Sequence, residues 1–232
     1  MVRLLLVLAC ASCGGAQYQS QRVAPPVDRS LFARDPGGQL SEEALQTLLA
    51  APVELVLPAR VGVLPIITAE DWRGPSPDWK RVPAGVAPFA RALRGTEPFG
   101  IVTEMLPIPS GALGMEALRE AAARYALRYI LLYREGVRHR ERANGWAAGY
   151  ATLVGMLFLP GQTLEVDGYL EASLFDVKTG LLLFTVRRAV GVTRSSTLFY
   201  TGTKLEDMQA KLAARFAPEL AADVRGDVAR LR

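Results

Sequence analysis

The chain has 232 residues, of which 50% are hydrophobic and 22% are charged, and its formal net charge at pH 7 is +4. A chain of this length and apolar content can bury one sizeable core. Its two cysteines, Cys10 and Cys13, both lie near the N-terminus, which excludes a disulfide framework or a cysteine-based metal site in the rest of the chain. The basic excess is too small for a typical nucleic-acid-binding protein, so we expect no nucleic acid as a partner, and we expect no cofactor.

The first residues, MVRLLLVLACASCGG, have the parts of an export signal. Arg3 supplies a positive charge, residues 4–9 form a short apolar run, and small residues follow. A helix that crosses a bilayer needs about 20 apolar residues, and this run is much shorter. The segment is therefore predicted to direct export rather than to span the membrane.

The residues around Cys13 make this segment resemble a bacterial lipoprotein signal, in which a cysteine is acylated with palmitate and becomes the first residue of the mature protein. Cys13 follows Ala11 and Ser12 and precedes glycine, so we predict lipidation there, with Cys10 as the alternative site. An ordinary secretory signal with incidental cysteines is the other interpretation. Residue 15, the second after Cys13, is Gly and not Asp. By resemblance to enteric lipoproteins, this implies that the protein is sorted to the outer membrane and faces the periplasm.

Residues 13–39 are predicted to form a flexible tether, because Gln, Ser, Gly and Pro dominate and no apolar period persists. Residues 1–12 are then the signal peptide, and residues 40–232 are predicted to form a single periplasmic domain. The domain begins with a short helix that Ser41 is placed to cap and that Pro52 ends.

Residues 59–67, with the sequence ARVGVLPII, are a near-continuous run of apolar and β-branched residues. This pattern predicts a central strand that is covered on both faces. Residues 70–88 have no sustained period and contain Trp72 and Trp79, which we predict as anchors for a partner protein. The alternative is that both tryptophans fold back over the edge of the sheet. A helix is expected at residues 88–94.

Three further elements follow along the chain. Residues 99–106 are predicted to form a strand and residues 113–125 a helix, whereas residues 129–133 are predicted to form a second buried strand that runs into a charged segment. The helix is expected to bury Leu113, Leu118, Ala121 and Tyr125.

His139 is the only histidine, and it lies in that charged segment. The arginines on either side of it would repel a metal ion and disfavour a protonated imidazole. A serine hydrolase would need His139 beside Asp176 and one of the serines at positions 195 and 196, but the sequence has no GxSxG motif. We therefore predict that the chain is not an enzyme and has no catalytic residue and no metal site.

Residues 145–161, GWAAGYATLVGMLFLPG, are the most hydrophobic segment after the signal. They are too short and too rich in glycine for a membrane-spanning helix, and they do not alternate as a membrane-spanning strand does. Two interpretations stay open. The segment is either a small-residue hairpin or helix packed on the core, or a protected contact surface for another copy or for a membrane.

A long hairpin and a closing helix complete the chain. Residues 163–177 and 181–195 are predicted to form the two strands, with turn chemistry between them and with one face of the first strand buried. Thr203 and Glu206 are spaced as a capping box for the helix, and Pro218 is predicted to kink it. The side chains expected at the centre of the domain are Leu174, Leu183 and Phe216.

These elements predict an α/β (α+β) fold, with a mixed sheet, flanking helices, a long C-terminal β-hairpin and a closing C-terminal helix. Three short motifs stand at residues 61–66, 125–131 and 174–183. They resemble the VAVLPF strand, the GADYVL helix-to-strand junction and the LVDVRTGEVL hairpin of envelope lipoproteins related to the curli-secretion channel lipoprotein and the penicillin-binding-protein activator lipoprotein. The resemblance implies this fold and no catalytic residue.

The resemblance leaves two function classes open. The first is a non-enzymatic envelope lipoprotein that acts as an adaptor or activator of a cell-wall or secretion component, and that binds its protein partner through a sheet edge or the loop with Trp72 and Trp79. The alternative is an oligomeric subunit of a secretion channel. A channel subunit extracted in detergent should run as a large ring, and an adaptor as a monomer or small complex.

Overall fold

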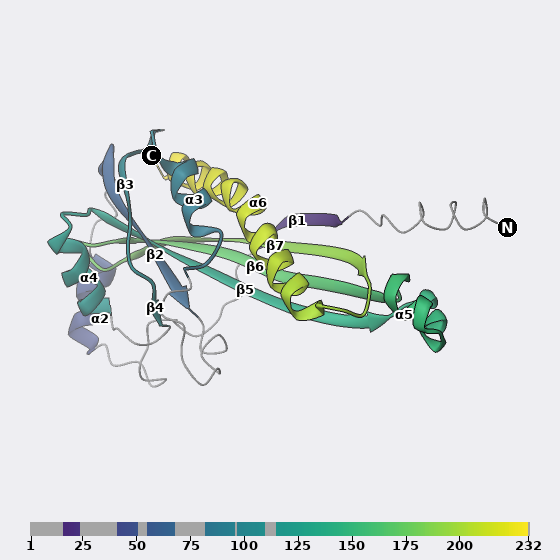
Figure 1. Cartoon of the computed structure of the whole chain (residues 1–232). Helices are drawn as coiled ribbons and strands as arrows, with labels where there is room; N and C mark the ends of the chain where they lie inside the picture. Colours follow the sequence, from purple (N-terminus) through teal and green to yellow (C-terminus); the bar gives the residue numbers. More distant parts are fainter. Residues whose placement is uncertain are drawn as a thin grey trace. The chain divides into compact units, whose positions relative to one another are not determined.

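The computed structural model describes residues 16–23, 41–50, 55–67, 82–95, 97–109 and 115–231. The helices and strands, labelled in Figure 1, are β1 (Gln17–Val23), α2 (Glu42–Ala50), β2 (Ala59–Ile67), α3 (Val86–Leu93), β3 (Phe99–Glu104), β4 (Ile108–Pro109), α4 (Met115–Arg124), β5 (Tyr129–Ala143), the 3-10 helix η2 (Gly145–Ala151), α5 (Leu153–Phe158), β6 (Gln162–Asp176), β7 (Leu182–Ser196) and α6 (Thr201–Arg230).

Within the described residues, seven strands form one mixed sheet. The strand order is β1-β7-β6-β5-β2-β3, and the short strand β4 pairs with β2. β2 runs parallel to β3, β4 and β5, whereas β6 and β7 are joined by a tight turn and therefore run antiparallel. The predicted α/β (α+β) class is confirmed, with its mixed sheet, flanking helices, long hairpin and closing helix.

The chain divides into two compact units. The first unit contains the described residues up to Gln21, together with Val137–Tyr169 and Ala189–Leu212. The second unit contains the described parts of Arg22–Gly136 and Ala213–Arg232, together with Leu170–Arg188. Strands β5, β6 and β7 and helix α6 each contribute residues to both units.

Strand β2 lies at the centre of the second unit, between β3 and β5. Its bounds, Ala59–Ile67, are those predicted from the apolar run, and every residue from Val61 to Ile66 is buried. Side chains alternate between the two faces of a strand, so a strand that is covered on both faces needs a continuous apolar sequence. The sequence ARVGVLPII meets that need.

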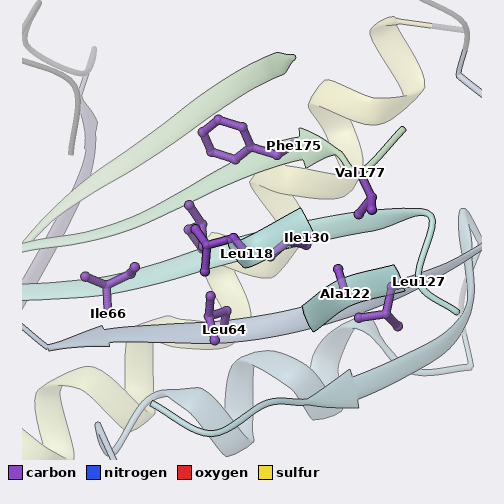
Figure 2. Packing of buried hydrophobic residues seen from close by; sticks show 9 residues of the cluster. Leu64, Ile66, Leu118, Ala122, Leu127, Ile130, Phe175 and Val177 are labelled. Atoms are coloured by element: carbon purple, nitrogen blue, oxygen red, sulfur yellow. The ribbon is translucent and has the colours of Figure 1, made fainter. Parts of the chain in front are cut away.

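Helix α4 covers one face of the sheet in this unit (Figure 2). The helix ends at Arg124, and Tyr125 is 53% exposed, although we predicted it as buried. The cause is that the chain leaves the helix here, with a φ of 52° at Ala126. The buried cluster between helix and sheet consists of Leu64, Ile66, Leu118, Ala122, Leu127, Ile130, Leu132, Phe175 and Val177.

The opposite face of the sheet is covered by α3 and by the C-terminal part of α6. The rings of Phe89 on α3 and Tyr133 on β5 lie 5.1 Å apart between centroids, and Arg225 of α6 donates a hydrogen bond to the carbonyl of Ala92 on α3. The second unit therefore has three layers, helix, sheet and helices. The residues that α6 buries here are Ala213, Phe216, Ala217, Leu220, Ala221, Val224 and Val228.

Helix α6 is a single element from Thr201 to Arg230. It begins two residues before Thr203, so the predicted capping box at Thr203 is wrong and this residue lies in the first turn. Pro218, where we predicted a kink, lies inside the helix. Phe216 is only 5% exposed, which confirms its predicted burial.

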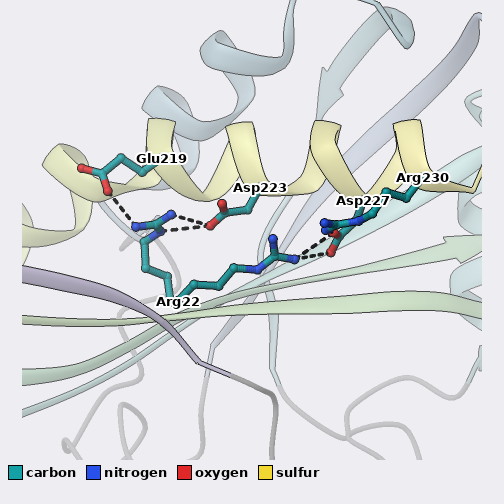
Figure 3. A network of polar contacts seen from close by, with 6 residues as sticks. Arg22, Glu219, Asp223, Asp227 and Arg230 are labelled. Carbon is teal, nitrogen blue, oxygen red and sulfur yellow. Dashed lines mark hydrogen bonds and ion pairs between the residues drawn. The ribbon is translucent and has the colours of Figure 1, made fainter.

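Acidic side chains of α6 hold two arginines of the sheet (Figure 3). Arg188 of β7 pairs with Glu219 at 2.8 Å and with Asp223 at 2.7 Å, and Arg22 of β1 pairs with Asp227 at 2.7 Å. The side chains of Arg188 and Asp223 are mostly buried, so removal of either one would leave a charge without its partner in a poorly solvated place. These pairs fix the helix over this part of the sheet.

Residues 17–23 form strand β1 at the edge of the sheet, beside β7, although we predicted a flexible tether there. The sequence QYQSQRV has little apolar character, but an edge strand needs only main-chain hydrogen bonds on one side, and polar side chains suit a water-facing edge. Residues 1–15 and 24–40 lie outside the described residues. The predicted boundaries of signal, tether and domain stay predictions.

The long hairpin has the predicted strands and turn. The side chain of Asp176 accepts a hydrogen bond from the backbone N–H of Lys178 at 2.7 Å, and Gly180 has a φ of 76°, which suits glycine. Two details differ from the prediction. The last seven residues of β6 are all buried, because helices cover both faces there, and Leu183 is half-buried whereas Leu174 is fully buried.

Candidate functional site

The residues predicted for lipidation and partner binding lie outside the described residues. They are Cys13, its alternative Cys10, Trp72 and Trp79. Their roles stay predictions, and the candidate site must be sought in the rest of the chain.

The groups considered for a hydrolase have other partners or open surroundings. Asp176 is 3% exposed and pairs with Arg128 at 3.1 Å. The hydroxyl of Ser196 accepts a hydrogen bond from the Lys204 ammonium at 2.8 Å, and His139 is exposed on β5. Among the described residues, no group of three metal-ligating side chains is brought together. The absence of catalysis stays a prediction.

The connection between β5 and β6, residues 144–161, is the most distinctive part of the first unit (Figure 1). Asn144 closes its base, because the backbone N–H of Asn144 donates to the carbonyl of Gly161 at 2.9 Å and its side-chain amide donates to the carbonyl of Pro160 at 2.8 Å. The Asn144 side-chain oxygen also accepts a hydrogen bond from the N–H of Trp146 at 3.0 Å, and it thereby caps η2. The connection is thus a built structure and not a loose loop.

Its two short helices pack through their backbones. A Cβ atom on Gly155 would lie 1.9 Å from the carbonyl oxygen of Gly149, far closer than real contacts allow, so only glycine fits there. The hydroxyl of Thr152 accepts a hydrogen bond from the N–H of Gly155 and donates one to the carbonyl of Gly149, both at 3.0 Å. Backbone and hydroxyl groups therefore bond one another inside the connection, where the side chain of Leu159 lies against Gly149 and the hydroxyl of Tyr150 donates to the Leu159 carbonyl at 3.3 Å.

Large apolar side chains of the connection face solvent instead. Gly155 is the one buried residue of α5, and η2 has none. The two helices of this segment are therefore not buried in the core, and the interpretation as a contact surface stays a prediction. The exposed residues are Trp146 at 48%, Leu153 at 75%, Val154 at 69%, Leu157 at 47% and Phe158 at 72%.

The loop between β7 and α6 adds three more exposed apolar side chains. β6 and β7 are neighbouring antiparallel strands, and a hydrogen bond of 2.9 Å joins the hydroxyls of Ser173 on β6 and Thr185 on β7. β7 therefore ends at the end of the hairpin where β6 begins, which is the end that carries the β5–β6 connection. We call the combined surface the apolar end; it consists of Trp146, Leu153, Val154, Leu157 and Phe158 together with Leu198, Phe199 and Tyr200.

Basic side chains precede the apolar end along β5. Arg138, Arg140 and Arg142 are exposed, and their spacing of two residues places them on one face of the strand. We call these three residues the arginine row; none of them has an ion pair within the described part of the chain. Near the end of β7, Arg194 is also exposed, and partial burial together with the charge of Arg194 lowers the pKa of Lys204.

Sequence reasoning found part of this site. The hydrophobicity of residues 145–161 marked the segment, but not the direction of its side chains. Leu198, Phe199 and Tyr200 were missed, because three apolar residues after a strand are an ordinary pattern. Among the helices in the described ranges, none combines the length and the apolar character that crossing a bilayer requires.

No family model matches the chain, and no curated protein matches its sequence. Among solved structures the chain is similar to two PelC dodecamers from Paraburkholderia phytofirmans, one of them a methionine variant, with 16% and 15% identity and a TM-score of 0.35 for each. The matches cover 88% and 87% of this chain and 99% and 97% of the PelC chains. A DUF330 protein from Xanthomonas campestris has 13% identity and a TM-score of 0.39, with 76% of this chain and 91% of that chain covered.

Proposed function

We propose that the chain is a non-enzymatic envelope lipoprotein that acts as an adaptor or activator of a cell-wall or secretion component. The single observation that carries this proposal is the apolar end, where eight large apolar side chains are at least 37% exposed and hydrogen bonds of Asn144 and Thr152 hold the β5–β6 connection together. Large apolar side chains that gather in exposed positions at one end of a folded chain indicate an interaction site. The protein therefore has an exposed apolar surface that is suited to contact with another component of the envelope.

The place of action follows from the N-terminal sequence. We propose that Cys13 carries the lipid, with Cys10 as the alternative, and that the protein is anchored in the outer membrane and faces the periplasm. Fatty-acid labelling and membrane fractionation test this. Cys13→Ser should lose the label and the membrane association, and Cys10→Ser should keep both. The reverse result, or fractionation with the inner membrane, would contradict the proposed site or address.

The adaptor role is tested by isolating the acylated protein from its native envelope. The protein should extract in detergent as a monomer or a small complex that contains a defined partner. A variant with Trp72→Ala and Trp79→Ala should lose that partner, whereas Leu106→Ser, which changes a side chain that is 82% exposed on another part of the chain, should retain it.

An oligomeric secretion-channel subunit is the competing function. It receives support from the same apolar end, since neighbouring copies in a ring would cover such a surface. A large, homogeneous ring after detergent extraction would favour the channel subunit and would refute the adaptor role.

A further inference from the structure

We propose that the apolar end is a membrane-docking site, which seats in the lipid surface that holds the chain's own N-terminal anchor. The proposal rests on the lipoprotein function above and names what covers the apolar end. Three observations carry it: the composition of the exposed surface, the charges beside it, and the place where the first strand begins.

The exposed side chains have the chemistry of a protein segment that lies in a membrane interface. Trp146 is half-exposed, and Leu153 and Phe158 are more than 70% exposed. Tryptophan favours the headgroup level, and Leu and Phe favour the upper acyl region, where interfacial helices bury their apolar face to a depth of about 5–10 Å. Helix α5 has only six residues, so it fits this shallow layer and does not span.

The charge beside the apolar end is complementary to an anionic lipid surface. The arginine row places three guanidinium groups on one face of β5, directly before the connection that carries Trp146 and α5. Glu141 is the exposed acidic residue of this stretch of β5 and lies on the opposite face of the strand. On the neighbouring strand β6, Glu165 and Asp167 are half-buried, so the three arginines outnumber the acidic groups beside them. Basic residues next to an inserted apolar surface strengthen its attraction to anionic headgroups.

The same charges disfavour a second copy as the occupant. In a symmetric dimer that buries the apolar end on itself, the same surface of each copy faces the other. An interface that brought the arginine row of one copy against that of the other would place like charges together, which is unfavourable.

The position of β1 keeps the proposed lipid anchor on Cys13 close to the first unit. Residues 17–21 of β1 belong to the first unit, which also contains the apolar end, and Arg22 belongs to the second. Cys13 precedes the first described residue, Ala16, by three positions. A fully extended chain of three residues spans at most about 11 Å, so an acyl group on Cys13 is held close to the unit that carries the apolar end.

The test uses the acylated full-length protein in vesicles that contain an anionic lipid. The chain has three tryptophans, so Trp72→Phe and Trp79→Phe leave Trp146 as the only indole. We expect the emission of Trp146 in vesicles to be blue-shifted relative to its emission in the protein unfolded in detergent-free denaturant. We also expect this emission to be quenched by lipids brominated near the headgroup end of their acyl chains. Leu153→Ser with Phe158→Ser should abolish this quenching, and the control Leu106→Ser should leave it unchanged.

A second set of variants tests the charges. Substituting all three residues of the arginine row by Gln should reduce the quenching in anionic vesicles and should have little effect in zwitterionic ones. Equal quenching of parent and triple variant in anionic vesicles would refute the part of the proposal that assigns the row to headgroups. Far-ultraviolet circular dichroism and thermal melting verify that each variant is folded.

The outcomes separate this proposal from the function on which it rests. Blue-shifted emission without quenching by brominated lipid would place Trp146 in a protein interface and would overturn membrane docking. The size of the particle would then show whether a second copy or another protein covers the apolar end. Water-exposed emission from an acylated, anchored protein would also overturn docking. Absence of the acyl group on the wild-type chain would instead refute the lipoprotein function.

Discussion

The substitution Gly155→Ala should open the β5–β6 connection without unfolding the rest of the protein. The new Cβ atom would lie 1.9 Å from the Gly149 carbonyl oxygen, whereas real Cβ contacts are essentially never under 3.0 Å. The two backbones must therefore separate by about 1 Å, a change that no side-chain rotation can provide. Gly145→Ala is the matched control, because a Cβ atom at Gly145 would meet nothing within 4 Å.

Two opposing contributions set the change in free energy that Gly155→Ala causes in the closed connection. Overpacking a close contact costs about 1–3 kcal/mol, and replacing glycine by alanine within a helix contributes about 1 kcal/mol in the opposite direction. A backbone contact cannot relax easily, so we expect a net loss near the upper end, about 2 kcal/mol. That loss raises the open fraction of the connection roughly thirtyfold.

Hydrogen exchange measured by mass spectrometry tests this expectation. In the closed connection the N–H of Gly155 donates to the Thr152 hydroxyl, that of Met156 to the Thr152 carbonyl, and that of Leu159 to the Gly155 carbonyl. These amides should exchange roughly thirtyfold faster in Gly155→Ala and at nearly the parent rate in Gly145→Ala. The melting temperature should change little in either variant. Equal exchange in the two variants would refute the close backbone contact.

Two further predictions concern the second unit. Leu174→Ala and Phe216→Ala should each lower the free energy of unfolding by about 2–5 kcal/mol, because each removes a buried side chain. His139→Ala should change that free energy by less than about 0.5 kcal/mol. A thermal-melt series of the full chain measures all three, and the opposite order of effects would contradict the buried positions of Leu174 and Phe216. Burial, and the charge and hydrogen bond of Glu135, raise the pKa of Tyr133 well above its usual 10.0. As the pH rises above about 10, Tyr133 therefore loses its proton in the unfolded chain before it does so in the folded one. In that range the free energy of unfolding falls by about 1.4 kcal/mol per pH unit, whereas below pH 10 the contribution of Tyr133 is fully present. Tyr133→Phe should have a shallower alkaline loss in denaturant titrations, and equal slopes would exclude Tyr133 as the cause.

Local patterns were sufficient where a single segment specified its own structure. The run at β2 predicted a strand that is buried on both faces, with bounds that match the structure, because a strand in the centre of a sheet must be apolar throughout. Asp176 and Gly180 predicted the turn of the long hairpin, because a short acidic side chain and a residue with positive φ are what that turn requires. The α/β (α+β) class followed from the order of such elements.

Other features depend on contacts between distant segments. The polar sequence of β1 has no strand signal of its own and is placed by the edge of β7 and by the Arg22–Asp227 ion pair. Tyr125 is exposed because the chain turns at Ala126. Leu183 lies near the start of β7, and other parts of the fold cover its side chain only in part. Periodicity does not contain this information, since it reports what a residue prefers and not which neighbour is present.

The sequence by itself determined the central strand, the hairpin turn and the presence of one strongly apolar segment at residues 145–161, whereas the export signal stays a prediction. Only the tertiary structure decided that Trp146, Leu153 and Phe158 of this segment are exposed, since its two short helices pack through the backbones of Gly149 and Gly155. Only the pairing of β6 with β7 placed Leu198, Phe199 and Tyr200 at the same end of the hairpin as this segment. The physical reason is that hydrophobicity belongs to a residue, whereas exposure belongs to the arrangement of all its neighbours.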